Sequence, residues 1–78
     1  MAKLPQVSAR ETIKALEKIG FAVIHQRGSH IKLIRKFENS TQTVIVPEKK
    51  VIKKGTLRNE ILKSINLSVE EFVKLLKD

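Results

Sequence analysis

The sequence contains no cysteine, tryptophan or tyrosine, and only three glycines and two prolines among its 78 residues. Without cysteine, the chain can form neither a disulfide nor a zinc site built on thiolates. No apolar run is long enough for a secretory signal or a membrane span, so the cytoplasm is the expected compartment. A chain of this length predicts a single domain over residues 1–78, in which residues 1–7 carry no pattern and form a loose N-terminal segment.

Aromatic residues are scarce at 4%, whereas hydrophobic residues make up 41%, which is too many for a disordered chain. The core is therefore expected to be aliphatic. Acidic residues are scarce too: 8 of them stand against 16 Lys and Arg, giving a net charge of +8. A field of this sign attracts polyanions. Nucleic acid is the first candidate partner, ahead of an anionic membrane or an acidic protein.

The positive charge is concentrated in two segments, 18–37 and 49–58, that contain no acidic residue. Their basic residues include Arg27, Lys32, Arg35 and Lys36 in the first, and Lys49, Lys50, Lys53, Lys54 and Arg58 in the second. Segregated charge of this kind is the electrostatic footprint of nucleic-acid binders. The simpler alternative is an ordinary solvated surface.

The pattern of side chains predicts the element order α-β-β-β-α-α. Ser8 and Glu11 have the spacing of a capping box, and an apolar stripe then predicts a helix over 9–19 that ends at Gly20. Three runs of β-forming residues predict strands over 21–26, 30–36 and 43–46. The first two form a hairpin in which Gly28 takes a positive φ, and Pro47 stops the third.

Two helices are expected after a basic loop over 48–55. Thr56 is the expected cap of a helix over 56–65, which Asn66 ends. A second capping box, Ser68 with Glu71, predicts a helix over 69–77. The fold class is therefore α+β, with a three-stranded antiparallel sheet and helices on one face.

The sequence has no P-loop, dinucleotide fingerprint or metal-binding cluster, so any chemistry has to come from few groups. His30 stands at the mouth of the tight turn Arg27-Gly28-Ser29, with Lys32 close behind. Imidazole titrates near pH 6.5, and RNA cleavage needs a base for the ribose 2′-hydroxyl and positive charge near the phosphorus. Strand alternation predicts that His30 and Lys32 lie on the open face of the sheet, while Ile31 and Leu33 face the helices.

A second candidate phosphate site is the start of the helix at Thr56, where Lys53, Lys54 and Arg58 surround free backbone N–H groups. Neither site is decisive alone. On local sequence alone, His30 is more simply explained as a polar residue at a hairpin end, and His25 as a structural or surface residue. The lysines have the alternative of being ordinary solvated residues beside a capped helix.

Taken together, the segments resemble the HicA (YcfA-like) family of toxins over about residues 8–76. The matching segments are Leu16-Glu17-Lys18 with Gly20-Phe21, Gln26-Arg27-Gly28-Ser29-His30, Val44 to Pro47, Lys54-Gly55-Thr56-Leu57-Arg58 and Ser68-Val69-Glu70-Glu71-Phe72. The combination of Gly-Ser-His at a hairpin with Gly-Thr-Leu-Arg at a helix start, in this order, is specific.

This resemblance implies a fold similar to a double-stranded-RNA-binding domain. It implies an mRNA interferase that cleaves RNA without a metal or other cofactor, with His30 as the catalytic residue. It also implies an RNA-binding surface to which Arg27, Gly28, Ser29, Lys32, Lys53, Lys54 and Arg58 are expected to contribute. The expected protein partner is a HicB-type antitoxin, whose surface should be acidic or RNA-like to cover a basic face.

One departure from the family stands after the third strand. Many members carry a further His shortly after its Val-Pro, where this chain has Glu48, Lys49 and Lys50. If that His assists catalysis, this chain would be the weaker enzyme.

Two other functions compete with the toxin. A non-catalytic RNA-binding module would have the same charge and fold, because double-stranded RNA is recognised mainly by shape and backbone contacts. A DNA-binding regulator would use the helices over 56–65 and 69–77 as a helix-turn-helix. Glu70 and Glu71 argue against the regulator, since they would meet the phosphate backbone.

Overall fold

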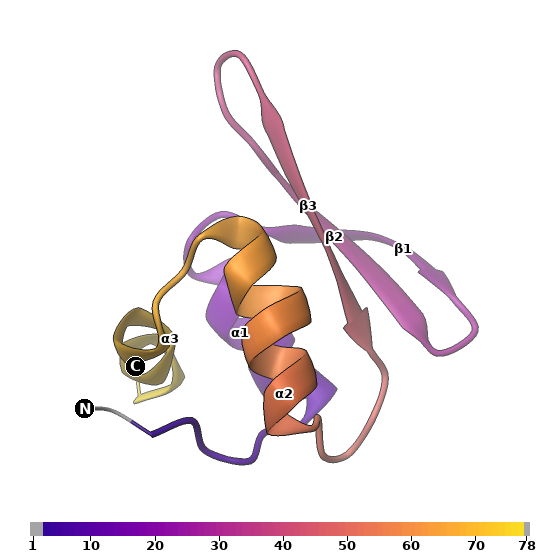
Figure 1. Ribbon diagram of the computed structural model, residues 1–78. Helices are drawn as coiled ribbons and strands as arrows, with labels where there is room; N and C mark the ends of the chain where they lie inside the picture. The colour runs from indigo at the N-terminus through magenta and orange to yellow at the C-terminus, as the bar shows by residue number, and fades with distance from the viewer. Residues whose placement is uncertain (1–2, 78) are drawn as a thin grey trace.

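The strands form one three-stranded antiparallel sheet in the order β1-β2-β3 (Figure 1). The computed structural model describes residues 3–77. Its elements are α1 (Ala9–Glu17), β1 (Ala22–Arg27), β2 (His30–Lys36), β3 (Thr41–Pro47), α2 (Lys54–Thr56), η1 (Leu57–Leu62), η2 (Lys63–Ile65) and α3 (Val69–Lys77). Three of these elements, α2, η1 and η2, follow one another without a break and form one helix over 54–65, here called the composite helix. This is the α+β architecture, similar to a double-stranded-RNA-binding domain, that the sequence predicts.

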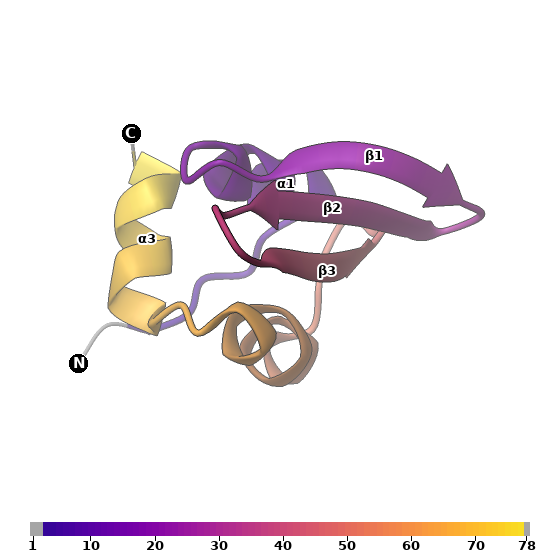
Figure 2. The same ribbon diagram turned by 90° about the horizontal axis from the view of Figure 1, so that it is seen from above.

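The helices lie to one side of the sheet. Figure 2 looks onto the opposite side, with α1 behind the strands, the composite helix along β3 and α3 beyond the strand ends. No helix of the described residues covers the side turned toward the viewer. We call this side the open face and the other the inner face.

The inner face contributes the centre of the hydrophobic core. Ile31 and Leu33 of β2 are buried, as alternation predicts, beside Val44 and Val46 of β3. The helices bury an aliphatic set against them, together with Phe21 and Phe72: Ala9, Ala15, Leu16, Leu57, Ile61, Leu62 and Ile65. The prediction of a mainly aliphatic core is confirmed.

Both predicted capping boxes are present. The Glu11 N–H donates to the Ser8 hydroxyl over 3.1 Å, and the Ser8 N–H donates to the Glu11 carboxylate over 3.0 Å. The Glu71 N–H donates to the Ser68 hydroxyl over 3.1 Å. Asn66, at φ 60 and ψ 36, ends the composite helix as predicted. These bonds satisfy backbone donors that would otherwise be orphaned at the helix starts.

The N-terminal segment was predicted to be loose, and this prediction is wrong for its described part. Leu4 and Val7 are buried, and Val7 forms an isolated antiparallel bridge with Ile52. The bridge also orders the predicted basic loop, since Ile52 itself is buried. Residues 1 and 2 lie outside the described residues. The sequence does not predict this packing, because two apolar side chains anchor the segment without forming a periodic pattern.

Several element boundaries differ from the prediction, and the first strand spans Ala22–Arg27 rather than 21–26. The first helix ends at Glu17 rather than at residue 19, and Gly20 still takes a positive φ of 104°. The third strand spans Thr41–Pro47 rather than 43–46, because Pro47 pairs as the last residue of an edge strand, where its missing N–H costs little. Thr56 is not a cap: the composite helix begins at Lys54 and has no side-chain cap.

Arg35 links β2 to the turn that follows α1 and to β3. Its guanidinium donates to the Ile19 carbonyl over 3.0 Å and to the Gln42 side-chain oxygen over 2.6 Å. It also stacks against Phe21 and Phe37, at 5.0 Å and 4.7 Å from their ring centres. Its charge therefore serves the fold rather than a surface that attracts a polyanion.

Replacing Arg35 with Ala is expected to lower the free energy of unfolding by about 2 kcal/mol. The change removes two hydrogen bonds to a charged group and the stacking on two rings, and it leaves partly buried acceptors unpaired. Denaturant unfolding followed by circular dichroism measures the difference. Lys36→Ala is the matched control, because the neighbouring Lys36 is exposed and its loss should change stability by less than about 0.5 kcal/mol. Equal stabilities for the two variants would contradict this role.

Candidate nucleic-acid interface

His30 is the first residue of β2, directly after the turn of the β1–β2 hairpin. Gly28 in this turn has φ 60, the left-handed conformation that the sequence predicts for it. His30 pairs with Arg27 of β1 on one side and with Pro47 of β3 on the other. Directly paired residues share a face of an antiparallel sheet, so these three form one row across the open face. His30 is exposed in this row.

A β-bulge in β1 brings the second histidine of the chain to the same face. Val23 pairs with Leu33, and the register then shifts so that His25 pairs with Lys32. Ile24 is the extra residue, and it is 51% exposed. Without the bulge, strand alternation would give His25 the opposite face from Lys32. The next row of the open face is therefore His25, Lys32 and Ile45.

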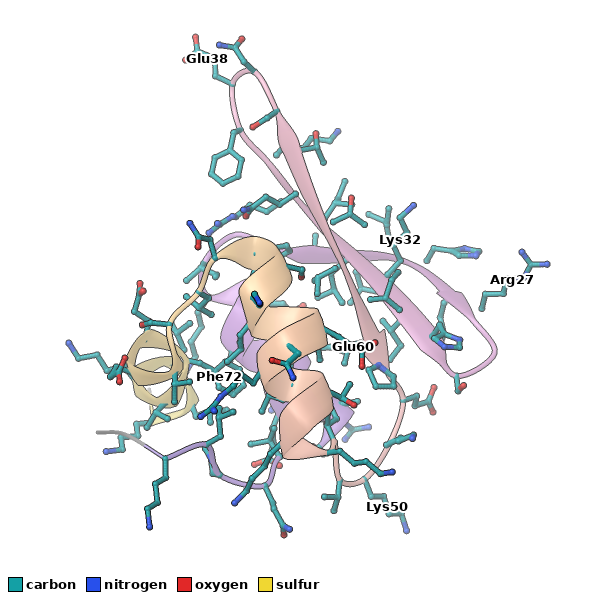
Figure 3. All side chains as sticks on the ribbon, viewed as in Figure 1. Arg27, Lys32, Glu38, Lys50, Glu60 and Phe72 are labelled. Atoms are coloured by element: carbon teal, nitrogen blue, oxygen red, sulfur yellow. The ribbon has the colours of Figure 1, made fainter. Side chains whose placement is uncertain are left out.

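The hairpin thus presents imidazole and positive charge together. In Figure 3 the labelled side chains of Arg27 and Lys32 extend from the hairpin on the side away from the composite helix. Arg27, His25 and His30 are exposed, and Lys32 is half-buried between its neighbours. An extended polyanion laid over this hairpin would meet cations and proton-transfer groups within two adjacent rows.

Hydrogen bonds from outside the turn fix its shape. The Gln26 side-chain amide donates to the Gly28 carbonyl over 3.2 Å and also to the carboxylate of Glu48. The Glu48 N–H donates to the Ser29 carbonyl over 2.6 Å. The residue before His30 is thus tied to the segment that follows β3, which holds the imidazole in place relative to the end of β3.

A cleft of about 450 Å³ opens beside His30, between β3 and the composite helix. Residues 43–45 and Pro47 form its strand wall, and Lys49 lies in it as well. Thr56, Glu60 and Ser64 line it from the composite helix. Figure 3 shows Glu60 on the side of this helix that faces the end of β3. The exposed imidazole therefore borders a cavity with polar groups on both walls.

Sequence reasoning missed the helix wall of this cleft, although a signal was present. Thr56, Glu60 and Ser64 recur at four-residue steps, each directly before a buried apolar residue. The middle of the helix is π-helical: the Lys63 N–H bonds to the Arg58 carbonyl, five residues back. A π-helical turn holds more than 3.6 residues, so side chains four residues apart lie on the same face of this helix.

The remaining predicted site residues lie elsewhere. Lys53 and Lys54 are exposed at the start of the composite helix and do not line the cleft. Arg58 lies on another side of that helix, in a depression near Asn66 and the start of α3. The structure therefore brings together Arg27, Gly28, Ser29, His30 and Lys32, but not the three basic residues of the second candidate site.

Two absences hold for residues 3–77, the part of the chain that the structure describes. No three side chains of the types that bind metal ions gather in one place. None of the helices formed by these residues is long and apolar enough to cross a membrane.

Residues 9–67, more than half of the chain, match the model of the family described as HicA toxin of bacterial toxin-antitoxin. The matched segment contains the hairpin, both walls of the cleft and the whole composite helix. No curated protein matches the chain.

Replacing Gln26 with Ala should loosen the His30 turn without unfolding the sheet. The variant lacks the amide that donates to the Glu48 carboxylate, so Glu48 is held less firmly against the turn. Hydrogen exchange at the Glu48 N–H should therefore accelerate several-fold, while amides at the centre of β2 keep their protection. Amide hydrogen exchange by NMR measures both. Gln6→Ala, at an exposed position outside the hairpin, should leave the Glu48 amide unchanged. Equal exchange at Glu48 in both variants would show that the backbone alone holds the turn.

Proposed function

The chain belongs to the HicA toxin family, and on this basis we propose that it is the toxin of a type II toxin–antitoxin system and a metal-independent endoribonuclease. In this proposal it is an mRNA interferase that cleaves single-stranded RNA, with His30 as general acid or base. The observation that carries the proposal is the position of His30, exposed in a basic row at the mouth of a polar cleft. Since mRNA is its substrate, the cytoplasm is the proposed compartment.

The groups around His30 suit phosphodiester cleavage. Transfer of the 2′-hydroxyl proton needs a group that changes protonation near neutral pH, which imidazole does. The negative charge that develops on the phosphorus oxygens needs nearby cations. Arg27 is paired with His30 across the strands, and Lys32 is in the next row. We propose that these two side chains, with Gly28 and Ser29 of the turn, hold the scissile phosphate.

The two lysines at the start of the composite helix have a different part in this proposal. Lys53 and Lys54 are exposed and lie outside the cleft, so they would contact phosphates farther along the strand. Arg58, on another side of the composite helix, would contact RNA only if the strand continues around that helix. Contacts of this type raise affinity without supplying base specificity.

The proposed protein partner is a HicB-type antitoxin. Silencing the toxin requires that RNA be kept from His30, and a partner that covers the open face does so directly. Such a partner would present acidic side chains to Arg27 and Lys32, since complementary charge favours association and excludes wrong partners.

Replacing His30 with Ala is expected to lower the rate of RNA cleavage by about 100- to 10,000-fold, the usual contribution of general acid–base catalysis. The assay follows cleavage of a single-stranded RNA in excess chelator, with partner-free protein. Added imidazole should restore part of the lost rate, because the cavity left by the side chain is open to solvent. Binding of the RNA, measured by fluorescence anisotropy, should persist. Equal cleavage by both proteins would refute the role of His30, and binding without cleavage by both would favour a non-catalytic RNA-binding module.

Replacing Lys32 with Gln is expected to weaken RNA binding similarly for all sequences. A lysine that neutralises one phosphate of a single strand accounts for a slope of about 0.7 in a plot of log affinity against log salt. The variant should lose that increment in an anisotropy titration over several salt concentrations. Lys77→Gln in α3, exposed and remote from the hairpin, removes the same charge as a control. The same slope for both variants would mean that Lys32 contacts no phosphate.

A further inference from the structure

The cleft beside His30 contains a carboxylate that the fold does not use. Glu60 is exposed, and no hydrogen bond or ion pair within the described residues holds its side chain. Other glutamates have such roles: Glu11 and Glu71 complete capping boxes, and Glu48 accepts from Gln26. Glu60 is thus free to act on a molecule that enters the cleft.

The charge of Glu60 is unfavourable for RNA binding alone. The chain carries a net charge of +8, and the other ionisable side chains of this cleft are His30 and Lys49. A carboxylate among them repels each phosphate that approaches. A group that weakens binding but lies opposite an imidazole in the same cavity has the arrangement of an acid–base pair.

We propose that Glu60 is a second catalytic residue and acts as the general base, while His30 acts as the general acid. This inference rests on the proposed ribonuclease function and assigns the two proton transfers within it. At neutral pH an exposed carboxyl group is ionised and accepts a proton, whereas a protonated imidazole donates one.

The proposed step is an internal transfer at phosphorus. The Glu60 carboxylate takes the proton of the ribose 2′-hydroxyl, and the 2′ oxygen uses the freed electron pair to form a bond to phosphorus. The bond from phosphorus to the 5′ oxygen breaks, and that oxygen keeps the pair and takes a proton from the His30 imidazolium. The products are a 2′,3′-cyclic phosphate and a 5′-hydroxyl. Glu60 then loses its proton to water, and His30 regains one from water.

The remaining polar groups of the cleft fit this assignment. Lys49 supplies positive charge where the phosphorus oxygens become more negative. The hydroxyls of Thr56 and Ser64 lie one helical step to either side of Glu60. The Ser64 hydroxyl donates to the Ile61 carbonyl over 2.8 Å, so toward a ligand it is an acceptor, suited to a ribose hydroxyl. The Thr56 hydroxyl can also donate, to a ribose or phosphate oxygen.

His25 is the competing candidate for the second proton-transfer group. The bulge gives it the same face as His30, opposite Lys32. It does not line the cleft, and the observations therefore favour Glu60. The experiment has to distinguish the two.

The test compares Glu60→Gln, Glu60→Asp, His25→Gln and Glu70→Gln with the parent chain, by kcat, KM and pH dependence on one RNA. Glu70 is an exposed glutamate of α3 outside the cleft, so Glu70→Gln controls for the loss of one negative charge. The Glu60→Gln variant should lose at least about 100-fold in kcat with an equal or lower KM, because a repulsive charge is gone. Glu60→Asp should recover part of that loss.

The pH profile supplies the second readout. Activity of the parent requires Glu60 ionised and His30 protonated, so kcat/KM should fall on both the acidic and the alkaline side. Lys49 is the other ionisable side chain that lines the cleft. Glu60→Gln should lose the acidic limb and keep the alkaline one, whereas His25→Gln should keep both.

Each other outcome rejects the assignment in a distinct way. Parental kcat and an intact acidic limb in Glu60→Gln would overturn the role of Glu60 while leaving the ribonuclease in place. If His25→Gln lost one limb of the pH profile instead, the acid–base pair would consist of His25 and His30. Failure of the parent chain to cleave RNA would overturn the proposed function, and this inference with it. A drop in thermal stability of Glu60→Gln that matches its loss of activity would reduce the residue to a structural one.

Discussion

The guanidinium of Arg35 is the interaction on which the arrangement of helices and sheet depends. Hydrophobic burial provides most of the free energy of folding, but it has no direction. Arg35 has direction: it bonds the carbonyl of Ile19 beyond α1 and the side chain of Gln42 in β3. Gln42 in turn donates to the carbonyl of Ile65, the last residue of the composite helix, over 3.4 Å. One side chain thus sets where both helices end against the sheet.

This arrangement reaches the candidate site through the composite helix. With its C-terminal end fixed at Ile65, the helix runs back along β3 and forms the second wall of the cleft beside His30. Glycine at position 20 is favoured because its φ of 104° strains any side chain, and a Cβ there would also lie 3.3 Å from the Arg35 side chain. The basic charge of this chain therefore has two uses. Arg35 holds the fold, while Arg27 and Lys32 remain on the open face.

The sequence predicts what depends on local pattern. Capping boxes, the hairpin turn at Gly28 and the burial of Ile31 and Leu33 follow from spacing alone, because each involves residues close in the chain. The bulge at Ile24 does not follow, since a register shift is decided by the partner strand. The anchoring of Leu4 and Val7 depends in the same way on a distant contact, with Ile52. For the site, sequence reasoning found the hairpin side but missed the helix side, which only the packing of the composite helix against β3 creates.

The bulge in β1 has a consequence for the behaviour of the chain in concentrated solution. Every residue of β1 is exposed, and β1 is an edge strand whose outer N–H and C=O groups have no neighbouring strand. Such an edge invites pairing with another chain and, through it, aggregation. The extra residue at Ile24 interrupts the regular row of these groups and twists the strand, and Arg27 adds charge near its end. The irregularity that turns His25 outward therefore also protects the sheet from growing by the addition of strands.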